Sequence, residues 1–353
     1  MEDETLLRCA SGGAVRRILL ALTLLATSAG ARTFEVTAYG AKGDGRADDS
    51  AAIEKTIAAA AEAGGGVVLF PTGRYKARVV ARTGVTLAGE GAYASFIEAL
   101  PSDGKTASYA IFGKEVSGVT VRDLTVIADG AQVFWPAGIR FAASSGVRVT
   151  GVTVRDSTNG QGIVFDEAPG FGSDNSVTDS TVRDSEQGIV IDNENVRVSG
   201  NFVENCKYGI SLEYATPHAA VVTGNIVDAK GREGSFGIVG SAADHAVISA
   251  NNIRGAWIGI YLKEKSNRVS VTGNLVSGSF GHGIKLEDAS SISVKDNLIE
   301  AAKGVGIGVE RSPGSHVAGN RVTGAGRCGI RASADDAVVA GNSVSGYAKE
   351  TCE

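Results

Sequence analysis

The chain has 353 residues, a net charge of −5, 48 glycines and 6 prolines. Its hydrophobic content of 43% is ordinary and its aromatic content of 6% is low. This composition is typical of a soluble, turn-rich β protein, and the acidic balance argues against nucleic acid or an anionic membrane as a partner. It does not exclude an acidic polysaccharide, since a local basic patch is enough to bind one.

Residues 1–31 are predicted to be a signal peptide. Arg16-Arg17 precedes the apolar run Ile18–Ala26, which is too short to span a bilayer, and Ala29-Gly30-Ala31 has the small-x-small form of a cleavage site. We expect cleavage after residue 31, export to the periplasm or the medium, and no membrane span. Acidic residues precede the arginines, so a further hypothesis places the true start at Val15.

Residues 32–80 are expected to form an N-terminal cap of strand, helix and strand. Phe34–Val36 predicts the first strand and Val67–Phe70 a later one. Between them, Asp48–Ser50 supplies N-cap candidates for an alanine-rich helix of about 13 residues, which Gly64–Gly66 ends. Because the open end of a solenoid exposes strand edges and core, we expect this helix to cover it.

Four motifs lie in this region, namely Tyr39–Gly45, Asp48–Ile53, Gly64–Gly66 and Phe70–Tyr75. Together they resemble the N-terminal signature of the pectate-lyase-like β-helix superfamily, which includes pectate-lyase-type and rhamnogalacturonase-type enzymes, mannuronan epimerase modules and phage tailspikes. The resemblance implies a right-handed parallel β-helix whose substrates lie along one sheet, across successive coils. It does not fix the reaction, because one fold hosts many chemistries.

Residues 81–353 are expected to form the coils of this β-helix, with about 22–28 residues each. An asparagine recurs at Asn201, Asn225, Asn251, Asn274, Asn297, Asn320 and Asn342. Such a period marks a solenoid, in which each coil buries its apolar side against its neighbours. Asparagine tolerates left-handed bends and its amide can bond up and down a column, so we interpret the column as a structural ladder.

A Gly-Ile pair recurs in step with the asparagines. The isoleucines are Ile139, Ile163, Ile189, Ile210, Ile238, Ile260, Ile284, Ile307 and Ile330. An apolar or small residue follows each of them two places later, and this period of two indicates short strands separated by Gly and Asn bends. The predicted fold class is therefore all-β: a single-stranded right-handed parallel β-helix with a short N-terminal capping α-helix.

The positions one and three residues after each isoleucine are expected to point outward and to form the substrate face. On three consecutive coils the outer column holds Asp166, Asp192 and Glu213. Carboxylates on adjacent coils would stand about 5 Å apart, and on alternate coils about 10 Å. These spacings suit the acid and base of a glycosidase, and the same three residues are also candidate ligands for Ca²⁺.

A lyase would take its base from Lys263, Lys285 or Arg331, acting on the C5 proton of a uronate. His282 is a further catalytic candidate, because Gly281-His282-Gly283 resembles the Gly-His-Gly motif of polygalacturonases. The paired-aspartate motifs of that family are absent where the coils would place them.

The remaining candidates are substrate-binding residues. The polar ones are Arg140, Glu287 and Arg331, and the candidate sugar-stacking rings are Trp135, Tyr214 and Tyr261. Trp257, two residues before a Gly-Ile pair, is expected to be a packing residue.

Cys328 and Cys352 are 24 residues apart, which is one coil. Neighbouring coils bring Cα atoms within disulfide range, and an exported protein permits the bond, so we predict a disulfide that holds the last coil. Cys206 is expected to be a buried apolar residue.

The resulting interpretation is an exported, monomeric enzyme that cleaves an acidic, uronate-containing polysaccharide such as pectin by β-elimination. Three alternatives stay open: a glycoside hydrolase of the rhamnogalacturonase or polygalacturonase type, a uronan C5-epimerase, and a non-catalytic carbohydrate-binding surface protein.

Overall fold

The computed structural model describes residues 32–101, 109–128, 136–166, 172–213, 219–333 and 335–353. Residues from Ala31 to Glu353 form one compact unit. The predicted signal peptide lies outside the described residues and stays a prediction. None of the helices in the described ranges is long and apolar enough to cross a membrane.

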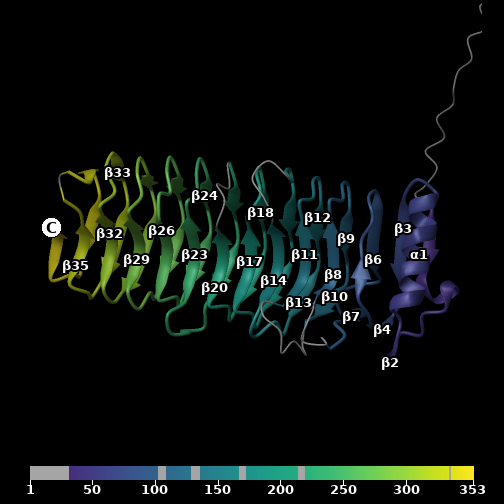
Figure 1. Cartoon of the computed structure of the whole chain (residues 1–353). Helices are drawn as coiled ribbons and strands as arrows, with labels where there is room; N and C mark the ends of the chain where they lie inside the picture. Colours follow the sequence, from purple (N-terminus) through teal and green to yellow (C-terminus); the bar gives the residue numbers. More distant parts are fainter. Residues whose placement is uncertain (1–31, 102–108, 129–135, 167–171, 214–218, 334) are drawn as a thin grey trace, which may run out of the picture. The chain divides into compact units, whose positions relative to one another are not determined.

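Three parallel sheets, here named A, B and C, run side by side with 13, 13 and 12 strands (Figure 1). In hydrogen-bonded order, sheet A holds β1 (Thr33–Glu35), β3 (Gly66–Phe70), β6 (Val85–Gly89), β9 (Thr120–Arg122), β12 (Arg148–Thr150), β15 (Ser176–Thr178), β18 (Arg197–Ser199), β21 (Val221–Thr223), β24 (Val247–Ser249), β27 (Ser270–Thr272), β30 (Ser293–Lys295), β33 (Ser315–Ala318) and β36 (Ala337–Ala340). Sheet B holds β2 (Asp44–Asp48), β4 (Gly73–Lys76), β7 (Ser95–Glu98), β10 (Thr125–Ile127), β13 (Thr153–Arg155), β16 (Thr181–Arg183), β19 (Phe202–Glu204), β22 (Ile226–Asp228), β25 (Asn252–Arg254), β28 (Leu275–Ser277), β31 (Leu298–Ala302), β34 (Arg321–Gly324) and β37 (Ser343–Ser345). Sheet C holds β5 (Val79–Val80), β8 (Tyr109–Lys114), β11 (Ala137–Ala142), β14 (Gln161–Asp166), β17 (Gln187–Ile191), β20 (Tyr208–Leu212), β23 (Phe236–Ser241), β26 (Ile258–Lys263), β29 (His282–Glu287), β32 (Val305–Glu310), β35 (Cys328–Arg331) and β38 (Lys349–Cys352).

The first coil gives β1 to sheet A and β2 to sheet B, and from β3 onward each coil contributes one strand to each sheet, so the predicted parallel β-helix is confirmed. The Gly-Ile strands form sheet C in register, with Ile139 beside Ile163 and Ile163 beside Ile189. Every isoleucine of this column, as far as Ile330, is at most 1% exposed. The period of two along each strand therefore places the apolar column inward, where stacking of like side chains removes it from water.

The asparagine ladder is confirmed in the turn between sheets A and B. Asn274 illustrates the pattern: its amide donates to Ile248 O at 2.9 Å and to Asn297 Oδ1 at 3.0 Å. Its own Oδ1 accepts from the backbone and side-chain nitrogens of Asn251, both at 3.0 Å. The Asn274 amide thus satisfies buried backbone groups of the preceding coil and bonds the ladder amides of both neighbouring coils.

The capping helix α1 (Ser50–Glu62) lies at the β1 and β3 end of the sheets (Figure 1) and buries Ile53 and Ile57 completely. Asp49 precedes it without capping it, because its carboxylate accepts the backbone N–H groups of Lys42 and Gly43 at 2.7 and 3.1 Å. The first strand ends one residue earlier than expected, since Val36 begins the short 3₁₀ helix η1 (Val36–Tyr39). Strands of the cap region join sheets A and B, so the cap continues into the coils.

The cysteines lie as expected. Cys328 and Cys352 form a disulfide between β35 and β38, with their Cα atoms 6.3 Å apart. Cys206 is buried and not in a disulfide, and burial raises the pKa of its thiol to about 12. The disulfide therefore links the last two strands of sheet C.

We expect Asn274→Ala to lower the free energy of unfolding by about 3 kcal/mol, because it leaves several buried backbone groups without partners. Asn342→Ala is the matched control, since Asn342 is only partly buried and water can replace its amide. Chemical denaturation followed by circular dichroism measures both. Equal losses in the two variants would contradict this account of the ladder.

Candidate functional site

The outward face of sheet C does not form one open groove. On the central coils, the outward positions one residue after each isoleucine are buried. Val164, Val190 and Val239 are 1 to 2% exposed, and Ser211 is 0% exposed. Val164 and Val190 pack with Ala137 in an apolar cluster on this outward side. The polar residues therefore gather in two places. The acidic strip comprises Arg140, Asp166, Asp192 and Glu213, and the charged cluster comprises Tyr261, His282, Lys285, Glu287, Glu310 and Arg331.

In the acidic strip, Arg140 and Asp166 form a two-point ion pair. Arg140 Nη2 lies 2.7 Å from Asp166 Oδ2, and its Nε donates to Oδ1 at 3.0 Å. Arg140 Nη1 also donates to the Tyr109 hydroxyl at 3.1 Å, and the guanidinium lies 5.5 Å from the centre of the Tyr109 ring. The carboxylate of Asp166 is thus neutralised by a cation held in a fixed orientation.

Glu213, the third acid of the strip, ends a row of side-chain amides. Gln161 Nε2 donates to Gln187 Oε1 at 2.7 Å, and Gln187 Nε2 donates to Glu213 Oε2 at 3.2 Å. Glu213 is only 7% exposed, so this row of hydrogen bonds extends over three coils and ends at a buried carboxylate. Asp192 lies between its two acidic neighbours, half-buried. Neither glutamine is among the site residues predicted from the sequence, although both directly precede a Gly-Ile pair.

The strip does not fit the calcium ion considered for it. No group of three or more His, Cys, Asp or Glu residues in the described ranges lies close enough to hold a metal ion. Asp166 is paired with Arg140, and Glu213 accepts from Gln187. A hard cation needs several oxygen ligands at once, and these oxygens already serve other partners.

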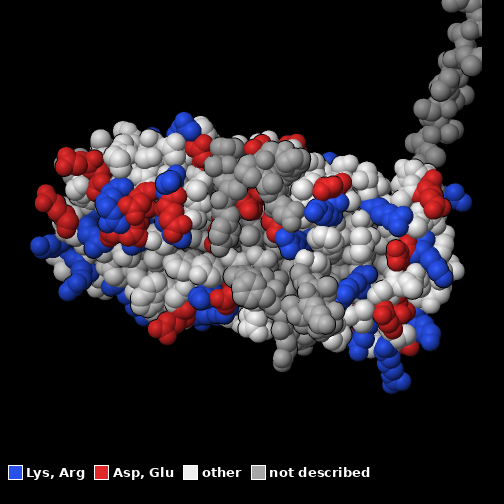
Figure 2. Space-filling model, viewed as in Figure 1, with Lys and Arg blue, Asp and Glu red and all other residues white. Residues whose placement is uncertain are grey.

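The charged cluster lies on the C-terminal coils of the same sheet. Lys285 Nζ is 2.8 Å from Glu287 Oε2 and 3.5 Å from Glu310 Oε2, and it lies 5.3 Å from the centre of the Tyr261 ring. The Tyr261 hydroxyl donates to Glu287 Oε2, and Arg331 forms an ion pair with Glu310. Figure 2 shows acidic and basic side chains gathered over the coils at this end of the unit.

These contacts shift two pKa values in opposite directions. The hydrogen bonds from Lys285 and then Tyr261 lower the pKa of Glu287 to about 2. Burial and the Glu287 carboxylate raise the pKa of Tyr261 well above its ordinary value. At neutral pH, Glu287 is therefore an anion and Tyr261 a protonated hydroxyl that can donate.

His282 is the neutral member of the cluster. Its ring lies over Gly308, where an added Cβ would stand 2.9 Å from Cδ2 and 3.2 Å from Nε2. Burial, followed by the charges of Lys285 and Arg331, lowers its pKa to about 4. Nε2 is buried and has no hydrogen-bond partner among the residues that the structure describes. Gly308 thus leaves room for an uncharged imidazole between two cations, because Gly308 lies in register between Lys285 and Arg331.

Other candidates have different places. Lys263 forms an ion pair with its neighbour Glu264 at 2.6 Å, and no described contact joins it to Lys285. Trp135 and Tyr214 lie outside the described residues. Glu310, which the sequence analysis did not select, is an ion-pair partner of both Lys285 and Arg331.

An aromatic row leads to the cluster. The Tyr208 and Phe236 rings stack with centres 5.3 Å apart, and Phe236 stacks on Tyr261 at 5.7 Å. Because these rings stack on one another, they cover each other's faces, and the row connects Tyr208 to Tyr261 of the charged cluster.

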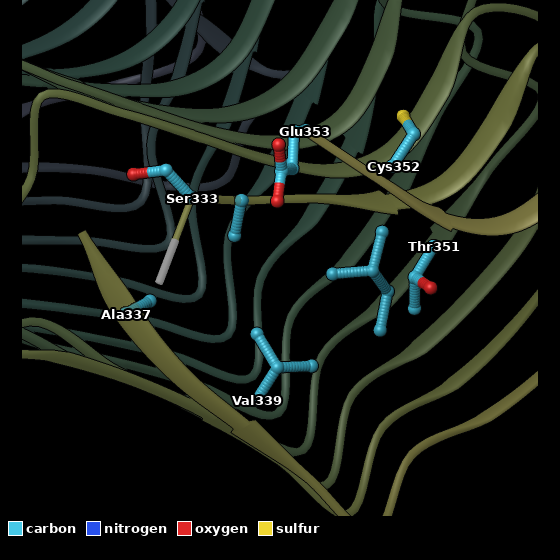
Figure 3. A pocket seen from close by; sticks show the side chains of 8 residues that line it. Ser333, Ala337, Val339, Thr351, Cys352 and Glu353 are labelled. Carbon is cyan, nitrogen blue, oxygen red and sulfur yellow. The ribbon is translucent and has the colours of Figure 1, made fainter. Parts of the chain in front are cut away.

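A pocket of about 480 Å³ lies between the last two coils (Figure 3). None of the residues that line it belongs to the charged cluster. Its lining residues are Ile330, Ala332, Ser333, Ala337, Val339, Thr351, Cys352 and Glu353. Glu353 is the one charged residue of this lining, so the pocket brings no acid and base together.

We expect the His282 imidazole to titrate with a midpoint near pH 4, because burial and two cations oppose its protonation. The free energy of unfolding should then rise between pH 4 and about 6.5, where the unfolded chain binds the proton and the folded chain does not. Proton–nitrogen NMR of the imidazole groups measures the midpoint, and His282→Gln assigns the signal. Lys285→Met should raise it, and a midpoint of about 6.5 in the unsubstituted chain would refute the buried placement.

Comparison with known proteins identifies the family to which the sequence is similar. Residues 33–235, more than half of the chain, match the family described as rhamnogalacturonase A/epimerase, pectate lyase-like, and residues 218–345 match the right-handed β-helix region. The A-module of mannuronan C5-epimerase AlgE4 from Azotobacter vinelandii has the same fold, with a TM-score of 0.72 and 20% identity over 91% of this chain and 98% of that module.

Two curated relatives match shorter segments. Mannuronan C5-epimerase AlgE4 of Azotobacter vinelandii is 36% identical over 105 residues, which is 26% of this chain and 19% of that protein. Alginate lyase 7 of the same organism is 51% identical over 43 residues, which is 12% of this chain and 5% of that protein. The matched segments thus span a fifth or less of these relatives. By the match over residues 33–235, the chain belongs to the rhamnogalacturonase A/epimerase, pectate lyase-like family.

Proposed function

We propose that this chain acts on a uronate-containing polysaccharide at the outward face of sheet C and removes the C5 proton of a uronate residue. The observation that carries the proposal is the place of the His282 ring over Gly308, which lies in register between the cations Lys285 and Arg331. Burial and these two charges lower the pKa of the imidazole, which agrees with a neutral base. Perturbed pKa values gathered at one place are characteristic of catalytic sites. The epimerase and lyase relatives support the choice of substrate class.

The cluster supplies the groups that this step needs. A uronate C5 proton becomes acidic when a cation neutralises the adjoining carboxylate, and Lys285 and Arg331 are placed to exchange a glutamate partner for a substrate carboxylate. The imidazole of His282 takes the proton at Nδ1, because Nε2 is buried, and the electron pair of the C5–H bond moves into the carboxylate group. Glu287 is the weaker base of the two, because its pKa is lowered to about 2, whereas the pKa of His282 is about 4 and its imidazole is uncharged at neutral pH.

Two outcomes follow from the same intermediate. Protonation of C5 from the opposite face, with Tyr261 as donor, gives the epimer and leaves the chain uncut. Expulsion of the oxygen at C4, with formation of a C4–C5 double bond, gives β-elimination, and Tyr261 then protonates the leaving oxygen. The sequence analysis favoured elimination. We now place epimerisation first, because the curated relative with the longer match is a C5-epimerase.

Hydrolysis is less well supported by the electrostatics of the site. A glycosidase needs one carboxyl group with a raised pKa to protonate the leaving group. Glu287 has a lowered pKa, and Asp166 is held by Arg140 in an ion pair that favours the carboxylate form. We place the reaction outside the cytoplasm on the strength of the predicted signal peptide, and no step of it uses a metal ion.

The test incubates the protein with polymannuronate, polyguluronate and polygalacturonate, with and without a chelator. Proton NMR detects inverted C5 centres, ultraviolet absorbance detects unsaturated uronate, and a reducing-end assay detects hydrolysis. We expect C5 inversion or unsaturated product on at least one polymer, unchanged by the chelator. New reducing ends without unsaturation would contradict proton abstraction.

Substitutions locate the base. His282→Gln should lower kcat by about 100-fold or more, the usual contribution of a positioned base. His316→Gln is the matched control, because His316 is exposed in β33 of sheet A, away from the cluster. Loss of turnover in Asp166→Asn together with full turnover in His282→Gln would move the base to the acidic strip. Binding without turnover on every polymer would favour the non-catalytic alternative.

A further inference from the structure

Two large aromatic side chains stay exposed at the corner between sheets B and C, outside the charged cluster. Trp257 is 42% exposed just before β26, and Phe280 is 37% exposed shortly before β29. The expectation that Trp257 is a packing residue is therefore wrong. Ala256, one residue earlier, holds the buried position instead.

The corner repeats from coil to coil, so these side chains form a column. Phe280 N donates to Ala256 O at 3.1 Å, and Gly281 N donates to Trp257 O at 2.8 Å. Lys303 N in turn donates to Ser279 O at 2.9 Å. Trp257, Phe280 and Lys303 thus occupy the same corner on three consecutive coils, about 4.8 Å apart along the axis.

Glycines keep the backbone low beside both rings. A Cβ at Gly281 would stand 3.2 Å from Trp257 Nε1, and a Cβ at Gly231 would stand 3.6 Å from Phe280 Cζ. Trp257 therefore lies against bare backbone and is partly open to solvent, and Phe280 is partly exposed with the Lys303 ammonium over its ring. This arrangement makes a shallow aromatic platform rather than a plug of the core.

Positive charge adjoins the platform. Lys303 Nζ lies 4.2 Å from the centre of the Phe280 ring, a cation–π distance. Arg327 is exposed on the following coil, where its backbone N donates to Gly304 O at 3.0 Å. The ligand that suits two rings followed by cations has an apolar face and a negative charge.

We propose that Trp257, Phe280 and Lys303 form a second carbohydrate-binding site, which takes a uronate-bearing segment of a polysaccharide. The apolar face of one pyranose ring stacks on Trp257, the next ring packs against the exposed part of Phe280, and a carboxylate pairs with Lys303 above the Phe280 ring. Gly281 alone separates Phe280 from His282 in the sequence, so a polymer held at the corner lies next to the charged cluster. The choice of ligand rests on the proposed substrate class, but the binding does not require turnover.

The test is native affinity electrophoresis of the full chain in gels that contain polymannuronate or polygalacturonate, with a neutral β-glucan gel for comparison. Trp257→Ala, Phe280→Leu and Lys303→Met should each weaken retardation by polyuronate about tenfold, which corresponds to about 1.4 kcal/mol. Tyr93→Ala is the matched control, because Tyr93 is 97% exposed and lies outside the corner. Phe280→Leu keeps an apolar side chain of similar bulk, so a fold defect does not explain its effect.

Each outcome decides the proposal. Unchanged retardation of Trp257→Ala and Phe280→Leu would overturn the site, and equal retardation by the neutral glucan would overturn the uronate assignment. His282→Gln should be retarded normally, because it does not contribute to the platform. Retardation that depends on Trp257 in a chain without detectable turnover would support this site while the proposed reaction fails.

Discussion

In-register hydrogen bonding between successive coils is the constraint on which the rest of this molecule depends. Each strand of the three sheets pairs with the strand one coil before and one coil after it, so residues one coil apart stand side by side. This pairing stacks the apolar columns inside and requires the turns to match as well. The asparagine ladder meets that requirement, because one amide bonds backbone and side chain on the preceding coil and the side chain on the following coil. The same pairing sets side chains of the outward face at fixed intervals, and it thereby determines which charges can meet.

Much of the fold could be predicted, because the spacing of the repeated residues indicates which residues lie side by side on neighbouring coils. The asparagine column and the Gly-Ile column give the coil length, the two faces and the inward residues. The N-terminal helix could be predicted from the N-cap candidates Asp48–Ser50 and from the glycines that end it. The 3₁₀ turn at Val36 could not, because Phe34–Val36 has the composition of a strand. The spacing of Cys328 and Cys352 gave the disulfide pair directly, since one coil separates them.

The site was harder to predict, because pointing outward is not the same as being exposed. Strand periodicity correctly placed Val164 and Val190 on the outer side, but it carries no information about what packs over them. Periodicity also cannot show that Gln187 bonds Glu213, or that Arg140 neutralises Asp166. The glycine at position 308 illustrates the same limit. In sequence it is one more small residue, whereas in space it provides the room that the His282 ring occupies.

The spacing of Lys285 and Arg331 has a consequence for the length of polymer that can bind in phase. They share one outward column two coils apart, so the distance between them is fixed by the protein backbone at about 9.6 Å. A sugar chain has its own repeat, which need not equal a whole number of coils. A small difference between the coil spacing and the sugar repeat adds up with every coil, so sugar residues and protein side chains drift out of register. Strong contacts are therefore confined to the few coils over which the two repeats match, and a longer β-helix would not by itself bind a longer stretch of polysaccharide more tightly.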